Sequence, residues 1–293
     1  MSTIGVDVGG TAVRAAVVDS AGVVLAVARG STRVPSLEAE ICRVVAELRS
    51  DFEVSAVGLA VAGFVAADRR TVMFAPHLPW RASAVADRLA GLIGLPVVLE
   101  HDANAAGVAE ARFGALRGAR VGLLVALGTG IGAALLIDGT VYRGAFGVAP
   151  ELGHLRLVPD GRDCPCGKRG CWERYCSGTA LAATAFELGA GELTGREVAR
   201  LAREGDAVAV AAVREMARWL GEGLALVADV YDPEVVAIGG GVSGSAELFL
   251  GDAVARFEAA VTGAGHRPVA RVLRAELGDE AGMVGAAVLA AAG

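Results

Sequence analysis

Apolar and polar positions near the start of the chain alternate in a way that predicts strands followed by one amphipathic helix. Apolar, β-prone runs cover residues 3–8, 12–18 and 22–28, and a polar, Gly-containing turn at 19–22 joins the second run to the third. Strands linked by such a turn are expected to pair as a hairpin. The spacing that follows is helical over residues 37–49, with apolar residues at Leu37, Ile41, Val44, Val45 and Leu48.

Helical and strand patterns alternate along the rest of the chain. Further strands are predicted over residues 54–61, 97–100, 121–127, 133–137, 234–238 and 270–274. Further helices are predicted over residues 83–94, 103–113, 179–189, 194–204, 207–231 and 245–262, with a last helix from Asp279. One stretch, residues 142–176, has no regular pattern.

The same succession of elements begins twice. Near residue 3 and again near residue 121, a strand runs into a turn of Gly and Thr, a second strand follows, and an Asp-containing turn leads to a third. This weak internal similarity indicates a duplicated βββαβα unit. We therefore predict an α/β protein with an N-terminal domain over residues 1–117, completed by the C-terminal helix 280–293, and a C-terminal domain over residues 118–279.

The composition of the chain excludes some classes of partner and indicates a cellular location. The 293 residues are 54% hydrophobic but only 5% aromatic, so small aliphatic side chains must fill the core. The formal net charge of −6 argues against nucleic acid or an anionic membrane as a partner. No apolar run is long enough to span a bilayer, and no secretory leader pattern opens the chain. The chain has five cysteines, an odd number, and four of them are clustered. This pattern fits metal binding in a reducing cytoplasm better than a set of disulfides.

Two Gly-rich turns have the chemistry of phosphate loops. Asp7-Val8-Gly9-Gly10-Thr11 and Gly128-Thr129-Gly130 follow strands at equivalent points of the two cycles. Glycine lets the backbone approach a phosphate closely and point its N–H groups at it, and Asp7 could hold a hydrated Mg²⁺. Either turn alone could be a plain hairpin turn. As a pair they would face each other across a cleft, which resembles the nucleotide clamp of the actin-like ATPases.

Two further candidates lie where a strand runs into a helix. Gly239-Gly240-Gly241 could let adenine and its ribose lie on bare backbone, or it could be only a tight turn. Asp102, which follows Glu100-His101, could accept the proton of a hydroxyl that attacks phosphorus. Spacing alone favours a helix N-cap for Asp102, and His101 by itself suits a structural hydrogen bond better than a ligand.

The most specific local signal is a set of metal ligands in the irregular stretch. Three thiols fall within eight residues, and the complete set is His154, Cys164, Cys166 and Cys171. Such a Cys₃His set binds Zn²⁺ tetrahedrally, and four protein ligands make the site structural. The alternative is a group of reduced cysteines without metal. Glu151 and Glu173 flank the set, so the metal loop would hold two carboxylates rigidly for a polyhydroxy ligand, and His154 could touch that ligand with its second ring nitrogen.

With these motifs in hand, the whole chain resembles the ROK family of repressors and sugar kinases, in particular its bacterial glucokinases. The order and spacing of eight segments carry the resemblance: Asp7-x-Gly-Gly-Thr-x-x-Arg14, 58–64, 74–80, Asp102-Ala-Asn-Ala-Ala, 127–132, Glu151-Leu-Gly-His154, 164–173 and 238–242. The resemblance implies two actin-like (ribonuclease H-like) domains with a cleft between them.

The resemblance also implies a role for each matching residue. Asp102 would be the general base that deprotonates the C6 hydroxyl of a hexose. The residues implied at the sugar are Gly63, His101, Glu151, His154 and Glu173. The residues implied at ATP and its Mg²⁺ are Asp7, Gly9, Gly10, Thr11, Gly128, Thr129 and Gly130, with the glycines 239–241 expected beneath the adenine. The Cys₃His set would hold structural Zn²⁺.

The implied activity is ATP-dependent phosphorylation of the 6-hydroxyl of an aldohexose, with glucose as the expected substrate and a homodimer or homotetramer as the expected assembly. Two departures from the family pattern leave the hexose open: His101 stands where Asn is usual, and Pro150 where Gly is usual. Mannose, allose and an N-acetylhexosamine are therefore alternatives. A sugar-sensing regulator without catalysis is another, although regulators carry a DNA-binding segment before the first phosphate loop and Asp7 lies almost at the start of this sequence.

Overall fold

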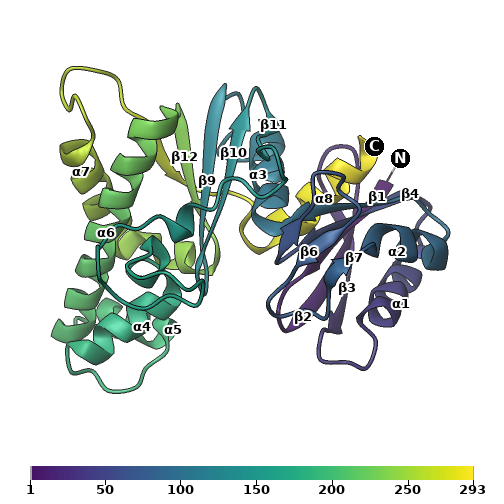
Figure 1. Cartoon of the computed structure of the whole chain (residues 1–293), viewed down its shortest axis with the longest axis horizontal. Coiled ribbons are helices and arrows are strands. Elements are labelled where there is room, and N and C mark those ends of the chain that lie inside the picture. The colour runs from purple at the N-terminus through teal and green to yellow at the C-terminus, as the bar shows by residue number, and fades with distance from the viewer. Residues whose placement is uncertain (1, 293) are drawn as a thin grey trace. The chain divides into compact units, whose positions relative to one another are not determined.

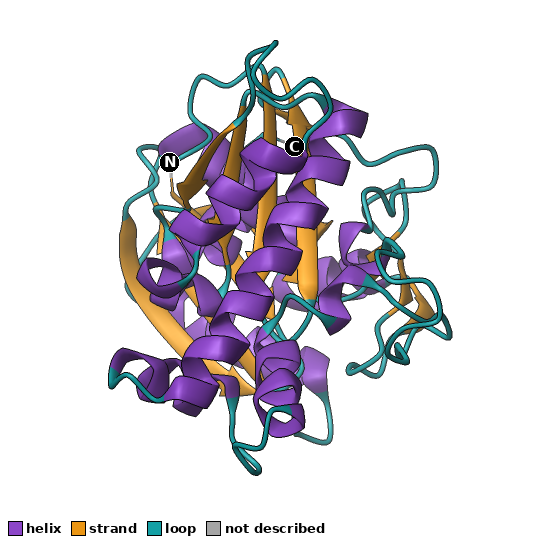
Figure 2. Ribbon diagram, turned by 90° about the vertical axis from the view of Figure 1, so that its left-hand side faces the viewer, coloured by secondary structure: helices purple, strands orange, loops and turns teal. Residues whose placement is uncertain are grey.

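A computed structural model describes residues 2–292, and the chain is an α/β protein in which helices lie beside strands, as predicted (Figure 1, Figure 2). The chain divides into two compact units. The first contains the chain up to Gly118, Ala134–Pro150 and the chain from Asp279 onward; the second contains Ala119–Ala133 and Glu151–Gly278. The domain limits expected from the sequence, 1–117 and 118–279, stay a prediction, because a compact unit is not yet a segment shown to fold alone.

The first sheet has five strands in the order β3-β2-β1-β4-β8. The strands are β1 (Ser2–Val8), β2 (Ala12–Val18), β3 (Val24–Ser31), β4 (Val54–Val61) and β8 (Val97–His101). β1, β2 and β3 pair antiparallel, whereas β4 is parallel to both β1 and β8. The β2–β3 hairpin agrees with the pattern in the sequence.

Helices α1 (Leu37–Arg49) and α2 (Val85–Ile93) cover one face of this sheet. All five apolar positions predicted for the buried face of α1 are buried, and they share one core with alternate residues of β1 and β4. Side chains along a strand point alternately to its two faces, so the other residues of β4 face away from α1 and α2.

Helices α3 (Asp102–Phe113) and α8 (Ala281–Ala291) pack together, and α8 lies directly on β1 and β4. A Cβ on Gly5 would lie 1.8 Å from the carbonyl oxygen of Met283, and one on Gly58 would lie 1.9 Å from that of Ala286. Any larger residue at these two positions would separate helix from sheet. The C-terminal helix thus rests on the strand that carries Asp7.

The second five-stranded sheet has the equivalent order, β11-β10-β9-β12-β13. Its strands are β9 (Val121–Leu127), β10 (Ile131–Ile137), β11 (Thr140–Val141), β12 (Val235–Gly239) and β13 (Arg271–Arg274). β12 is parallel to β9 and β13, as β4 is parallel to β1 and β8. The remaining long helices are α4 (Gly178–Glu187), α5 (Gly195–Arg203), α6 (Ala207–Tyr231) and α7 (Leu250–Ala260). The repeated order confirms the duplication.

Two features differ from the sequence-based expectation. The helix predicted over 245–262 is wrong in its first part: a 3₁₀ segment, Gly241–Leu248, ends before α7 begins, and Ser245 inside it has non-helical angles. Gly and Ser weaken helices and favour turns, which explains the break. A small sheet of β5 (Phe64–Val65), β6 (Val72–Phe74) and β7 (Arg81–Ser83) was not predicted, because strands this short show no period. None of the helices between residues 2 and 292 is long and apolar enough to cross a membrane.

Candidate functional site

The first Gly-rich loop continues β1 into β2. Gly9 donates its N–H to the carbonyl of Ala12 at 3.1 Å, which closes the turn. A Cβ on Gly10 would lie 3.2 Å from the Cβ of His77, so a larger residue would crowd that side chain. Thr11 is exposed. The loop therefore presents backbone and one hydroxyl to solvent at the end of a buried strand.

Asp7 is not an isolated carboxylate. The guanidinium of Arg14, its partner across the β1–β2 ladder, donates to Asp7 Oδ2. Burial nevertheless raises the pKa of Asp7, Arg14 opposes that rise, and the nearby carboxylates of Asp102 and Asp279 add to it. Asp102 and Asp279 therefore lie close enough to Asp7 to affect its pKa.

Asp102 is the first residue of α3, and it is His101, not Asp102, that occupies the N-cap position. The N–H of Ala103 donates to Asp102 Oδ1 at 2.7 Å, and His101 Nε2 lies 3.2 Å from the same oxygen. The side chain of Asp102 is 42% exposed. One carboxylate edge is thus fixed by the protein, and the group remains accessible to a ligand.

Gly63 follows β4 and packs tightly. A Cβ there would lie 2.7 Å from the carbonyl oxygen of Phe74 and 2.7 Å from the side chain of Ala75. Glycine at 63 therefore lets the end of β4 approach the small sheet, whether or not a sugar lies beside it.

The second Gly-rich loop borders a cavity of about 510 Å³ within the second unit. Gly128 and Thr129 line it, together with the first turns of α4 and α5, part of α6 and the 3₁₀ segment after β12. Of the three predicted glycines 239–241, which begin at the last residue of β12, only Gly241 lines the cavity. Gly240 has φ 76°, and a Cβ there would lie 2.5 Å from the carbonyl oxygen of Leu127. The tight-turn interpretation therefore accounts for Gly240, and the ligand interpretation suits Gly241.

Several cavity residues were missed by sequence reasoning: Thr179, Thr194, Arg196 and Met216. Two helix starts could have revealed Thr179, Thr194 and Arg196. Ser177 caps α4 and Thr194 opens a capping box with Glu197 on α5. Helix N-termini present unpaired N–H groups and attract anions.

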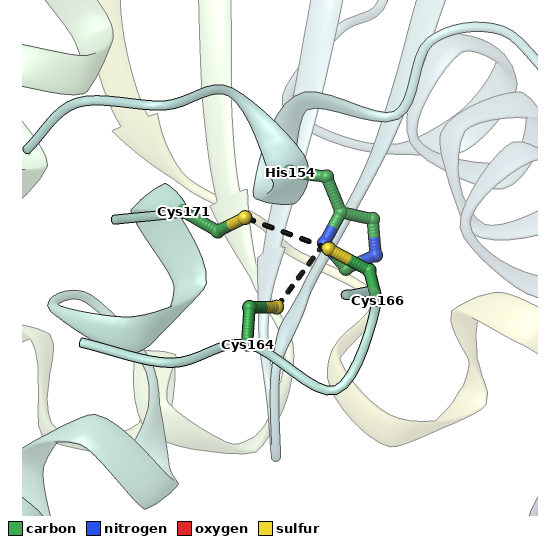
Figure 3. A group of neighbouring side chains, drawn as sticks. All are labelled: His154, Cys164, Cys166 and Cys171. Atoms are coloured by element: carbon green, nitrogen blue, oxygen red, sulfur yellow. Dashed lines mark hydrogen bonds between the residues drawn. The ribbon is translucent and has the colours of Figure 1, made fainter. Parts of the chain in front are cut away.

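The four predicted metal ligands meet in one place (Figure 3). Their ligand atoms all lie within 4.8 Å of one another. Cys164 Sγ is 3.7 Å from His154 Nδ1, and Cys166 Sγ is 3.6 Å from Cys171 Sγ. Ligands on a tetrahedral Zn²⁺ with ordinary bond lengths lie about 3.3–3.8 Å apart, and these two pairs have that spacing. Burial would raise the pKa of Cys166, but hydrogen bonds from the Lys168 backbone N–H and the other two thiols outweigh it and lower that pKa.

Both flanking carboxylates lie beside this cluster. The thiol of Cys164 donates to Glu173 Oε1 at 3.1 Å, and His154 Nδ1 is 3.6 Å from the same oxygen. On the other side of the imidazole, Nε2 lies 4.0 Å from Glu151 Oε2. His154 therefore points one nitrogen at the thiols and the other towards Glu151, the arrangement that ligation plus substrate contact requires.

The loop that carries the cluster is anchored to the rest of its unit. Trp172 is fully buried, donates its indole N–H to the carbonyl of Trp219 at 2.9 Å, and fits against Gly223 of α6. The Gly178 N–H donates to the carbonyl of Gly128 at 2.8 Å. A Cβ on Gly130 would lie 2.3 Å from Glu173 Oε2. The carboxylate of Glu173 thus lies against the second Gly-rich loop.

The predicted site residues therefore form two groups, each within one unit. In the first unit lie Asp7, Gly9, Gly10, Thr11, Gly63, His101 and Asp102; in the second lie Gly128, Thr129, Gly130, Glu151, His154, Glu173, the three cysteines and Gly239–Gly241. Gly130, Gly239 and Gly240 do not line the cavity of the second unit.

Comparisons with known proteins identify the family of the chain. A sequence profile of the ROK family matches residues 3–292. The chain is 41% identical to a glucokinase of Streptomyces coelicolor over 98% of its own length and 97% of that protein. A crystal structure of a ROK family glucokinase from Streptomyces griseus in complex with glucose and AMPPNP is 44% identical, with a TM-score of 0.88 and full coverage of both chains. A ROK hexokinase from Thermus thermophilus is 33% identical, with a TM-score of 0.84 over 100% of this chain and 98% of that one.

Proposed function

Because the chain belongs to the ROK family along nearly its whole length, we propose that it is an ATP-dependent kinase that phosphorylates the 6-hydroxyl of glucose. The observation that carries the proposal is the accessible carboxylate of Asp102 at a strand–helix junction, in a chain 44% identical to a glucokinase crystallised with glucose and AMPPNP. The products are glucose 6-phosphate and ADP.

Asp102 acts as general base in this proposal. Its free oxygen accepts the proton of the 6-hydroxyl as the hydroxyl oxygen attacks the γ-phosphorus, and the bond to the ADP oxygen breaks. The N–H of Ala103 and the imidazole of His101 hold the other oxygen. A general base of this kind contributes roughly 10²–10⁴-fold to a rate.

The hexose contacts come from residues around the metal cluster. Glu151, His154 and Glu173 accept or donate hydrogen bonds to ring hydroxyls, with Gly63 and His101 completing the sugar site. Zn²⁺, held by His154 and the three cysteines, supplies a rigid anchor and no chemistry.

The nucleotide contacts divide between the two units. Gly128, Thr129 and Gly241 border the cavity of the second unit, and we assign the adenosine part of ATP to it. Gly9, Gly10 and Thr11 of the first unit, with Gly130, are assigned to the phosphates. Asp7 would hold Mg²⁺ through its carboxylate, and the ion would neutralise phosphate charge. A cytoplasmic homodimer or homotetramer remains part of the proposal.

One observation favours testing other hexoses. His101 stands beside the base and replaces the Asn that the family usually has there, so the hydroxyl pattern read at this point can differ. Mannose, allose and N-acetylglucosamine are the informative alternatives.

The test is a coupled ADP-release assay with ATP and Mg²⁺ across those hexoses. We expect turnover with the highest kcat/KM on glucose, and we expect Asp102→Asn to keep its fold and glucose affinity while kcat falls by about 10²–10⁴-fold. No ADP release with any hexose would refute the kinase and favour a sugar-sensing regulator. Near-normal kcat in Asp102→Asn would remove Asp102 from its role.

A further inference from the structure

A buried carboxylate lies directly behind the proposed base. Glu100 is the penultimate residue of β8 and is 2% exposed. Its Oε2 accepts two hydrogen bonds from Arg143, from Nε at 2.9 Å and from Nη2 at 2.6 Å. Its Oε1 accepts from the His101 N–H at 3.1 Å and from Asn104 Nδ2 at 3.0 Å.

A second arginine completes this cluster. Arg69 Nε lies 3.6 Å from Glu100 Oε2 and donates to the carbonyl of Leu99 at 3.3 Å. The hydrogen-bond partners of Glu100 are therefore all donors, and both carboxylate oxygens serve as acceptors. An ionised carboxylate satisfies these donors, whereas an amide would turn its own N–H₂ towards them.

The donors come from segments far apart in the sequence. Arg69 lies in the turn between β5 and β6, Asn104 in the first turn of α3, and Arg143 just after β11, in the chain that leads to Glu151. His101 and Asn104 lie on either side of Asp102. Glu100 thus fixes both ends of the short stretch that carries the base and ties it to the segment before Glu151.

We propose that Glu100 is a positioning residue for the phosphoryl transfer, which it serves by holding the His101–Asn104 backbone so that Asp102 meets the substrate hydroxyl. This inference rests on the proposed function. Because Glu100 is buried, it would affect the reaction through the position of Asp102 and not through a contact with substrate or nucleotide. A displacement of about 1 Å at a reacting group can cost about 10²-fold in rate. Loss of the hydrogen bonds made by Glu100 should therefore lower kcat without removing any substrate contact.

The test compares Glu100→Gln with Arg143→Met and with the conservative Arg143→Lys. We expect kcat to fall by about 10- to 100-fold in Glu100→Gln and Arg143→Met, while the KM values for ATP and hexose change by less than about threefold. Arg143→Lys, which keeps a cation and a donor, should recover most of the rate. The His101 amide should exchange with deuterium faster in Glu100→Gln, because it loses an acceptor.

Three checks separate this role from a simple loss of folded protein. Calorimetric titration with AMPPNP counts competent molecules through the cavity of the second unit. Circular dichroism reports the fold. Arg70→Met is the matched control, because Arg70 also pairs with a carboxylate in the first unit but is 58% exposed, and exposed pairs contribute little; its kcat should equal that of the wild type.

Each outcome decides the proposal. A folded Glu100→Gln protein with kcat within about threefold of the wild type overturns the positioning role, and so does an Arg143→Met protein with normal kcat if Glu100→Gln does not fold. An equal fall in kcat for Arg143→Lys and Arg143→Met also counts against it. A wild type that releases no ADP with any hexose refutes the proposed function instead, so the two failures are distinguishable.

Discussion

The carboxylate of Glu173 occupies its position only because residue 130 has no side chain. A Cβ on Gly130 would lie 2.3 Å from Glu173 Oε2, and real Cβ contacts are essentially never shorter than 3.0 Å. Gly130→Ala must therefore push that oxygen from 2.3 Å to at least 3.0 Å, a shift of about 0.7 Å or more. Gly130 has no left-handed backbone angle, so alanine adds no backbone strain there.

The expected effect falls on the hexose and not on stability. The far end of a glutamate side chain can move by rotation, so the melting temperature should change by less than a few degrees. If Glu173 binds a ring hydroxyl as proposed, the displaced carboxylate loses its alignment with that hydroxyl. One hydrogen bond to a charged group is worth about 1.5–3 kcal/mol, which corresponds to a rise in the hexose KM of roughly 10- to 150-fold.

Steady-state ADP release measures this effect, with hexose varied at saturating ATP and ATP varied at saturating hexose. Gly251→Ala in α7 is the matched control, because a Cβ there meets nothing within 4 Å, and we expect wild-type kinetics. Gly128→Ala also meets nothing within 4 Å, but Gly128 lines the cavity, so only the ATP KM should rise. A Gly130→Ala enzyme with an unchanged hexose KM would refute the assignment of Glu173 to the sugar. The ATP KM of the same variant tests separately the assignment of Gly130 to the phosphates.

Three further predictions concern the metal, the hexose and pH. Cys166→Ser should lower the zinc content measured by mass spectrometry and weaken glucose binding in calorimetry, because the loop that carries Glu173 loses its anchor; wild-type protein without zinc would contradict this. His101→Asn should change the ratio of kcat/KM for glucose to that for mannose, and an unchanged ratio would exclude His101 from hydroxyl selection. The raised pKa of Asp7 means that its contribution to stability is fully present below its ordinary value near 3.8 and is lost as pH rises through the raised pKa. Urea denaturation gives the free energy of unfolding of the wild type and of Asp7→Asn. The difference, wild type minus variant, should therefore fall as pH rises from about 4 towards neutrality. A difference that stays constant with pH would contradict the burial argument.

The sequence alone determined the elements whose pattern is local. The five apolar positions of α1 and the long helix α6 follow from a period of 3.6 residues, and β2, β4 and β9 have the predicted ends. The metal ligands were found because three thiols within eight residues leave few other uses. Duplication then predicted the second sheet from the first.

Only the tertiary structure decided which distant groups meet. Glu100 and Arg143 lie 43 residues apart, and nothing near either residue marks one as the partner of the other, since the chain contains many carboxylates and arginines. The same holds for Glu173 against Gly130, for Trp172 on Gly223, and for Arg196 at the cavity. Short-range patterns fix secondary structure because each turn of helix or pair of strand residues carries the signal. A buried ion pair is specified only once packing has removed water from both partners and brought their donors and acceptors together.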